Sequence, residues 1–112
     1  MKYDVTKLSR KYVFHIPLYR YEENGLVPIG IDGLLDELIS EFSKSGFENF
    51  YFLKAKAHYK SRCFDELLLV MFAESAEPEA IFRKWFKKGN DVLGQEAFAW
   101  ECGNSLFVED LI

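Results

Sequence analysis

Two stretches of the chain combine alternating polarity with side chains that could bind a ligand or move a proton. Residues 11–21 contain a histidine and tyrosines, and residues 50–59 contain lysines, a histidine and several aromatic rings. Both stretches alternate with a period of two, which predicts β-strands. Imidazole, phenol and ammonium groups beside aromatic rings could hold an anionic or aromatic small molecule. The candidate ligand-binding residues are therefore His15, Tyr19, Phe52, Lys54, Lys56 and His58.

The histidines and lysines of this set also have a purely structural explanation. A histidine in a strand is usually a packed or surface residue, and alternating lysines such as Lys54 and Lys56 more often protect an edge strand by their charge. We favour this protective role over an anion site. Neither histidine is spaced from Cys63 or Glu101 in the way that metal ligands usually are. We therefore predict neither a metal nor another cofactor. The sequence shows no set of nucleophile, base and orienting group, so we assign no catalytic residue.

The chain is organised around an uninterrupted apolar run, Leu67–Phe72. The run is too short for an independent helix and lies between acidic residues, so it predicts a strand buried on both faces. The polar link Lys60–Cys63 would join it to the strand at residues 50–59 in an antiparallel hairpin. Both faces of this central strand then need a cover, and the helices of the chain can cover one of them.

Two helices are predicted from apolar residues at helical spacing. The first would run from Asp32, as N-cap, to just before Gly46. The second would start near Pro78, a residue tolerated in a first helical turn, and stop at Gly89–Asn90. Its four basic residues are followed by five acidic ones in residues 91–112, and the two blocks could pair within one subunit or between subunits.

The remaining segments predict extended structure. After a turn at residues 22–25, residues 26–31 would form an extended loop broken by a proline and a glycine. Residues 95–102 predict a fourth strand, and residues 106–108 a short final strand or an extended tail. The register of the fourth strand stays open at this point. Its side chains on the face away from the helices would be either Ala97, Ala99 and Glu101 or Phe98, Trp100 and Cys102.

The element order predicts the fold class. Strands and helices follow as β-α-β-β-α-β, and right-handed crossovers then favour an α+β, ferredoxin-like sandwich. Its antiparallel sheet would carry both helices on one face, with a short C-terminal extension. At 112 residues the chain is expected to form one domain, residues 1–112, in which residues 1–10 are a loose leader.

The last third of the chain carries a resemblance. The helix Ile81-Phe82-Arg83-Lys84-Trp85-Phe86 is followed by Leu93-Gly94-Gln95-Glu96-Ala97-Phe98, a Gly-Gln-Glu step that leads into a strand. This segment resembles a small uncharacterised bacterial family whose members are ferredoxin-like. The resemblance implies the same fold as the element order. It implies no catalytic residue, because the family has no established activity.

Composition limits the class of partner. The net charge of −4 argues against a nucleic-acid-binding protein, which would normally be basic. The start of the chain lacks the apolar core of a signal peptide, and no apolar run is long enough to span a membrane. We therefore expect a cytoplasmic protein without a membrane partner. Cys63 and Cys102 are expected to be reduced thiols, with a single disulfide as the less favoured alternative.

The sequence predicts a shape more firmly than an activity. The sheet face away from the helices should carry an apolar patch larger than a monomer normally leaves exposed. We favour a binding or assembly module that forms a homodimer through this face. Alternatively, the face is a pocket for an anionic or aromatic small molecule. The least favoured hypothesis is a dimeric ferredoxin-like enzyme with His15, His58 or Tyr19 as acid or base.

Overall fold

The computed structural model describes residues 3–112. Within these residues the chain has an α+β architecture with seven strands, all paired antiparallel, and two helices. In chain order the elements are β1 (Arg10–Pro17), β2 (Tyr19–Glu22), β3 (Gly25–Pro28), α1 (Asp32–Lys44), β4 (Phe50–Tyr59), β5 (Arg62–Ala73), α2 (Glu77–Leu93), β6 (Ala97–Cys102) and β7 (Ser105–Asp110).

Five of the strands form one sheet in the order β4-β5-β1-β6-β7. The apolar run Leu67–Phe72 belongs to β5, which lies between β4 and β1. Its predicted place in the interior of the sheet is confirmed. The predicted hairpin is confirmed as well, because β4 and β5 pair from Tyr59↔Arg62 to Phe50↔Met71. Lys60 and Ser61 form its turn, both with positive φ.

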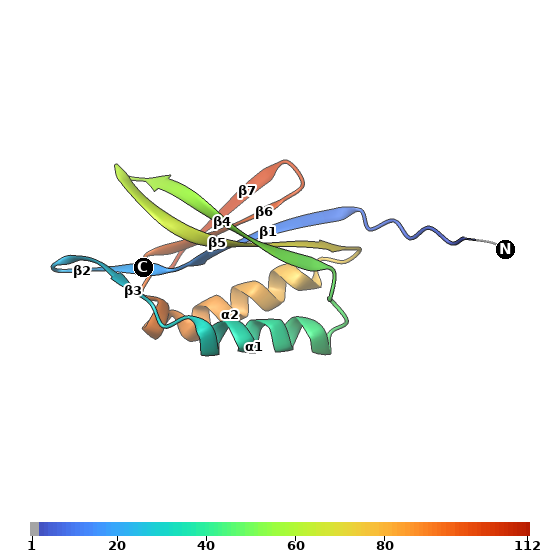
Figure 1. Cartoon of the computed structure of the whole chain (residues 1–112), viewed down its shortest axis with the longest axis horizontal. Helices are drawn as coiled ribbons and strands as arrows, with labels where there is room; N and C mark the ends of the chain where they lie inside the picture. Colours follow the sequence, from blue (N-terminus) through green and yellow to red (C-terminus); the bar gives the residue numbers. More distant parts are fainter. Residues whose placement is uncertain (1–2) are drawn as a thin grey trace.

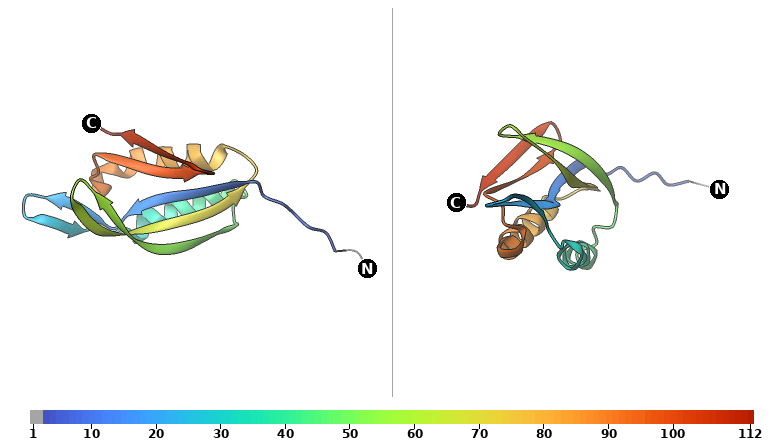
Figure 2. Two further views of the ribbon diagram at one scale, coloured as in Figure 1. Left: turned by 90° about the horizontal axis from the view of Figure 1, so that it is seen from above. Right: turned by 60° about the vertical axis from the view of Figure 1, so that its left-hand side comes forward.

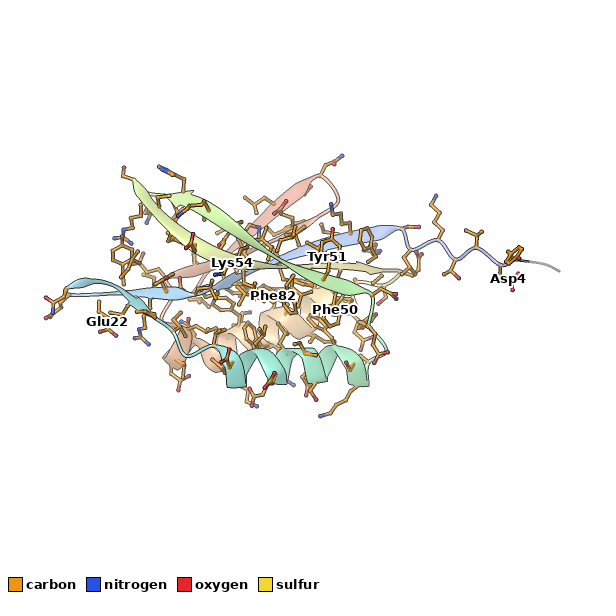
Figure 3. The ribbon with its side chains drawn as sticks, viewed as in Figure 1. Asp4, Glu22, Phe50, Tyr51, Lys54 and Phe82 are labelled. Atoms are coloured by element: carbon orange, nitrogen blue, oxygen red, sulfur yellow. The ribbon has the colours of Figure 1, made fainter. Side chains whose placement is uncertain are left out.

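Both helices cover the same face of this sheet and lie side by side beneath it (Figure 1). One alternating set of β1 side chains, Tyr12, Phe14 and Ile16, points towards them and is fully buried. Phe82 of α2 lies at the centre of this core (Figure 3), where its ring contacts five other aromatic rings. These are the rings of Phe14, Trp85, Phe86, Phe98 and Trp100.

The predicted ends of the helices need two corrections. Ile31, not Asp32, is the N-cap of α1, so Asp32 lies in the first turn, where its charge suits the helix dipole. Helix α2 does not stop at Gly89–Asn90 but continues to Leu93 and ends at Gly94, whose φ is +62°. Gly89 instead allows the two helices to approach closely, since a Cβ there would lie 3.3 Å from the Leu34 side chain.

Two segments are more regular than predicted. Residues 26–31 are not simply an extended loop, because β3 pairs with β2 in a separate hairpin. Pro28 ends β3 in this two-stranded hairpin, where a missing amide donor is tolerated. The segment after the fourth strand is a strand rather than a tail, and β7 pairs with β6 along its whole length.

The charge blocks of the second half meet within the chain. Arg83 and Lys87 of α2 both bind the Glu109 carboxylate of β7, with the Arg83 guanidinium at 2.8 Å. Cys63 and Cys102 are free thiols. Residues 3–9 have neither helix nor strand and run away from the body of the fold (Figure 1), while residues 1–2 of the expected leader lie outside the described residues. No helix within residues 3–112 has the length and apolarity needed to span a membrane.

Candidate functional site

The face of the sheet opposite the helices is hollowed. The β4–β5 and β6–β7 hairpins both rise on this side (Figure 1), and the end-on view in Figure 2 shows the sheet curling around it. A cleft of about 600 Å³ lies here, and five strands and the hairpin β2–β3 contribute to its lining. Its principal lining residues are His15, Pro17, Tyr19, Tyr21, Leu26, Ala55, Ala57, Tyr59, Arg62, Phe64, Glu66, Leu68, Gln95, Ala97, Ala99, Leu106 and Val108.

The register of the sheet determines which side chains meet on this face. Val13 of β1 is opposite both Val70 of β5 and Glu101 of β6, so these three positions share the open side. The open register question is thereby answered for β6. Ala97, Ala99 and Glu101 lie on the open face, while Phe98 and Trp100 are buried in the core.

His15 is the polar centre of the cleft. Its Nδ1 lies 2.9 Å from Glu66 Oε1, and its Nε2 lies 2.6 Å from Glu101 Oε2. The Glu66 side chain is only 12% exposed, against 22% for His15 and 41% for Glu101. Each carboxylate uses one oxygen for the imidazole. The central strand β1 thus joins an acidic residue of each neighbouring strand on the open face, and His15 and Glu66 of this group line the cleft.

This arrangement favours the charged form of His15. Burial of the imidazole lowers its pKa, but the hydrogen bonds to Glu66 and Glu101 and their negative charges raise it by more. The pKa of His15 is therefore above its ordinary value of 6.5. A carboxylate only accepts hydrogen bonds. Because each ring nitrogen of His15 binds a carboxylate, both nitrogens must carry a proton and donate it. One imidazolium between two carboxylates leaves the group with a net charge of −1.

The raised pKa of His15 predicts a pH dependence of stability. The stabilisation is fully present below the unfolded-state pKa of about 6.5 and is lost as the pH rises through the higher pKa of the folded state. We expect the free energy of unfolding to fall across this window in urea titrations, and expect His15→Gln to remove that slope. His58→Gln is the matched control and should retain it. A ring titration of His15 below pH 6.5, followed by NMR, would contradict the prediction.

Aromatic and basic side chains surround the other end of the cleft. The guanidinium of Arg62 lies 3.7 Å from the centroid of the Tyr21 ring, a cation–π contact. It joins the tip of the β4–β5 hairpin to the β2–β3 hairpin. Tyr19, Tyr59 and Phe64 also line this end. The cleft therefore has an acidic floor at one end and an aromatic, basic wall at the other.

The Gly-Gln-Glu step forms part of the same wall. Gly94 has the left-handed conformation, and a Cβ there would lie 2.6 Å from the Arg20 guanidinium carbon. Arg20 uses that space to donate to the carbonyl of Val92 at 2.8 Å, at the end of α2. The Gln95 amide donates to the carbonyl of Tyr19 at 3.0 Å. These bonds fix the chain between α2 and β6 against the hairpin that borders the cleft.

The structure brings four of the six predicted site residues to the cleft. His15, Tyr19, Lys56 and His58 border it, whereas Phe52 and Lys54 do not. Lys56 and His58 nevertheless share the orientation of Phe52, because they alternate with the open-face residues of β4, so the predicted face is wrong for them as well. The prediction that Phe52 lies on the open face is wrong, because its side chain packs against the core. Its neighbour in the same set, Phe50, lies on the helix side of β4 and contacts Phe42 (Figure 3). The open-face residues of β4 begin instead with Tyr51 and Leu53.

Four residues of the site were not predicted as site residues, namely Glu66, Glu101, Arg62 and Phe64. Glu66 and Glu101 were separate acidic positions, 51 and 86 residues from His15. Arg62 belongs to the predicted polar link, and Phe64 directly follows it. The sequence signal that could have identified them is their alternation with Glu66. Every second residue of this strand points to the same face, and these residues are Arg62, Phe64, Glu66 and Leu68. In residues 3–112, no three His, Cys, Asp or Glu side chains are grouped so that they could hold a metal ion.

The fold is similar to that of a solved structure, whereas two other comparisons found no match. No protein-family model matches the chain, and no curated protein matches it. Among solved structures, the fold is similar to that of a phage SAM lyase in complex with S-methyl-5′-thioadenosine, with a TM-score of 0.65. The alignment covers 98% of this chain and 95% of the lyase chain, at 10% sequence identity. The two proteins thus share a fold over nearly their whole lengths.

Proposed function

We propose that the cleft binds a small molecule that combines a positive charge with an aromatic base, of the S-adenosylmethionine type. The observation that carries this proposal is the largely buried carboxylate of Glu66 at the apolar floor of the cleft, held by His15. An ionised group in such a place is expensive to desolvate, and a cationic ligand would compensate the net charge of −1. The proposal differs from the alternative suggested by the sequence, an anionic or aromatic ligand, because it requires a cationic group.

The walls of the cleft support the aromatic part of the ligand. Tyr19, Tyr21, Tyr59 and Phe64 surround its outer end. Planar rings of this kind stack on a nucleobase, and such contacts are worth about 1–3 kcal/mol per base in nucleic-acid complexes. A volume of about 600 Å³ also falls within the usual range for small-molecule sites.

The fold similarity supports the same ligand class. The similar protein is named as a SAM lyase, and its structure contains S-methyl-5′-thioadenosine. S-adenosylmethionine carries a sulfonium cation, whereas S-methyl-5′-thioadenosine is a neutral thioether. A carboxylate such as Glu66 in the cleft would therefore hold the sulfonium more tightly than the thioether. If the chain also cleaves the sulfonium, this difference would favour release of the product.

The proposal is tested by calorimetric titration with S-adenosylmethionine, S-methyl-5′-thioadenosine and adenosine. We expect all three to bind in the millimolar range or tighter, with S-adenosylmethionine binding most tightly. Incubation with S-adenosylmethionine, followed by chromatography, then determines whether S-methyl-5′-thioadenosine is released and the protein is an enzyme. Failure of all three compounds to bind at millimolar concentration would overturn the proposal.

A second proposed function is self-association, favoured by a separate observation. Large apolar side chains border the open face on the two edge strands of the sheet, and they are between 47% and 61% exposed. They are Tyr51 and Leu53 on β4 and Leu106 and Val108 on β7. We propose that a second copy of the chain packs against these edges and forms a homodimer. Such a dimer would also cover the mouth of the cleft.

We expect Leu53→Asp and Val108→Asp to reduce the solution mass measured by light scattering over a range of concentrations, because each places a charge in the proposed contact. Lys54→Asp, at a neighbouring exposed position with the opposite orientation, is the matched control. Phe52→Asp and Met71→Asp would not serve, because Met71 is fully buried and Phe52 packs against the core. A wild-type monomer at all concentrations would exclude self-association.

We also propose that the domain is a variant of the ferredoxin-like sandwich. Without the β2–β3 hairpin and β7, the strand order is β4-β5-β1-β6, and both helices lie on one face. Counted along a β-α-β-β-α-β unit, these are its second, third, first and fourth strands. This is the strand order of the ferredoxin-like sandwich, which supports the assignment. Two free thiols are in keeping with a cytoplasmic location, which we retain as a proposal.

A further inference from the structure

Three side chains form a row along β5, of which one is positively charged, one is apolar and one is negatively charged. Arg62, Phe64 and Glu66 are alternate residues of this strand, and all three line the cleft. Their partners on β4 are Tyr59, Ala57 and Ala55, which line the same cleft. The row therefore presents a positive charge, an apolar ring and a negative charge to one ligand, in that order.

We propose that Arg62 binds the carboxylate of a zwitterionic ligand whose cationic group lies at Glu66. This inference rests on the proposed function and specifies its substrate class, an adenosyl compound with an amino-acid end. Four residues of a strand span roughly 13 Å. That distance accommodates an arginine and a glutamate side chain that reach towards each other, with a short aliphatic arm between them. Phe64 lies beside the middle of such an arm.

Arg62 is the best placed of the basic residues near the cleft. Its guanidinium is held over the Tyr21 ring, and stacking of this kind uses the face of the group and leaves its N–H edge available to a carboxylate. Lys56 is already paired with Asp65 at 3.2 Å, and Lys60 lies 4.0 Å from Glu96. Among residues 3–112, Arg62 forms no ion pair within 4.0 Å. A planar guanidinium also matches a carboxylate in geometry.

The test compares two stable thioethers that differ at the amino-acid end. S-adenosylhomocysteine has a carboxylate and an ammonium group, and S-methyl-5′-thioadenosine has neither. We expect Arg62→Gln to weaken calorimetric binding of S-adenosylhomocysteine by about tenfold or more, as for loss of a charge-assisted hydrogen bond. Binding of S-methyl-5′-thioadenosine should change by less than about twofold. Lys60→Gln removes the same charge at the same hairpin tip without lining the cleft, and should leave both affinities within about twofold.

The outcomes separate this inference from the proposed function. If the wild-type protein binds neither thioether nor S-adenosylmethionine, the proposed function itself is wrong. If it binds them and Arg62→Gln weakens both thioethers equally, or neither, only the role of Arg62 is overturned. Should the variant fail to fold, wild-type protein is titrated with decarboxylated S-adenosylhomocysteine, which keeps the ammonium group. Binding about tenfold weaker than that of the parent compound would support a carboxylate site, and equal binding would overturn it.

Discussion

Replacing Glu66 with glutamine is expected to weaken binding of S-adenosylmethionine by roughly 10- to 100-fold, the usual effect of losing an interaction with a partly buried charge. Glutamine keeps the size and the acceptor oxygen of Glu66 but removes its negative charge. The side chain is 12% exposed, so water cannot fully replace that charge. Isothermal titration calorimetry measures the change directly. Binding of the neutral S-methyl-5′-thioadenosine should fall much less.

Glu101→Gln is the matched control for this experiment. Glu101 binds the other nitrogen of the same imidazole but is 41% exposed, so screening by water should make its effect the smaller one. Both variants should also lower the pKa of His15, because each removes a carboxylate that raises it. An unchanged affinity of Glu66→Gln for S-adenosylmethionine, in a protein whose His15 pKa has fallen, would show that the acidic floor does not hold the cation.

Replacing Phe82 with alanine is expected to lower the free energy of unfolding by about 3–5 kcal/mol, the usual cost of deleting a large aromatic side chain from a core. Phe82 is fully buried. It connects α2 to the sheet through contacts with Phe14 of β1 and with Phe98 and Trp100 of β6. A cavity at this position would remove contacts on several sides at once. Total stabilities of about 5–15 kcal/mol are typical, so the loss is a large share.

Urea unfolding followed by tryptophan fluorescence measures this loss, since Trp85 and Trp100 both contact Phe82. Tyr3→Ala is the control, because Tyr3 is an aromatic residue that is 85% exposed and its loss should cost less than about 1 kcal/mol. Similar losses for the two variants would show that the aromatic cluster around Phe82 is not the main core.

The site was predicted only in part, because the sequence does not show which face of a strand is covered. Strand β4 is the example. Its sequence alternates throughout, but Phe50 and Phe52 share their orientation with Lys54, and one strand cannot reveal which set is covered. The lysine suggested the open face, whereas the helices cover the two phenylalanines. Lys54 is exposed nonetheless, because β4 is an edge strand whose hairpin rises away from the helices (Figure 1). If the wrong face of a strand is taken as the covered one, every side chain of that strand is assigned to the wrong side of the sheet.

The sequence by itself determined the two helices and the strands β1, β4, β5 and β6, but not the β2–β3 hairpin. Alternation in residues 11–16 and the apolar run Leu67–Phe72 are local patterns, and burial of apolar area holds them in place. Only the tertiary structure decided that His15 lies between Glu66 and Glu101. That contact depends on the registers of β1 with β5 and β6, which pair residues far apart in the chain. Such registers result from the packing of the whole sheet on two helices, and no local pattern encodes them.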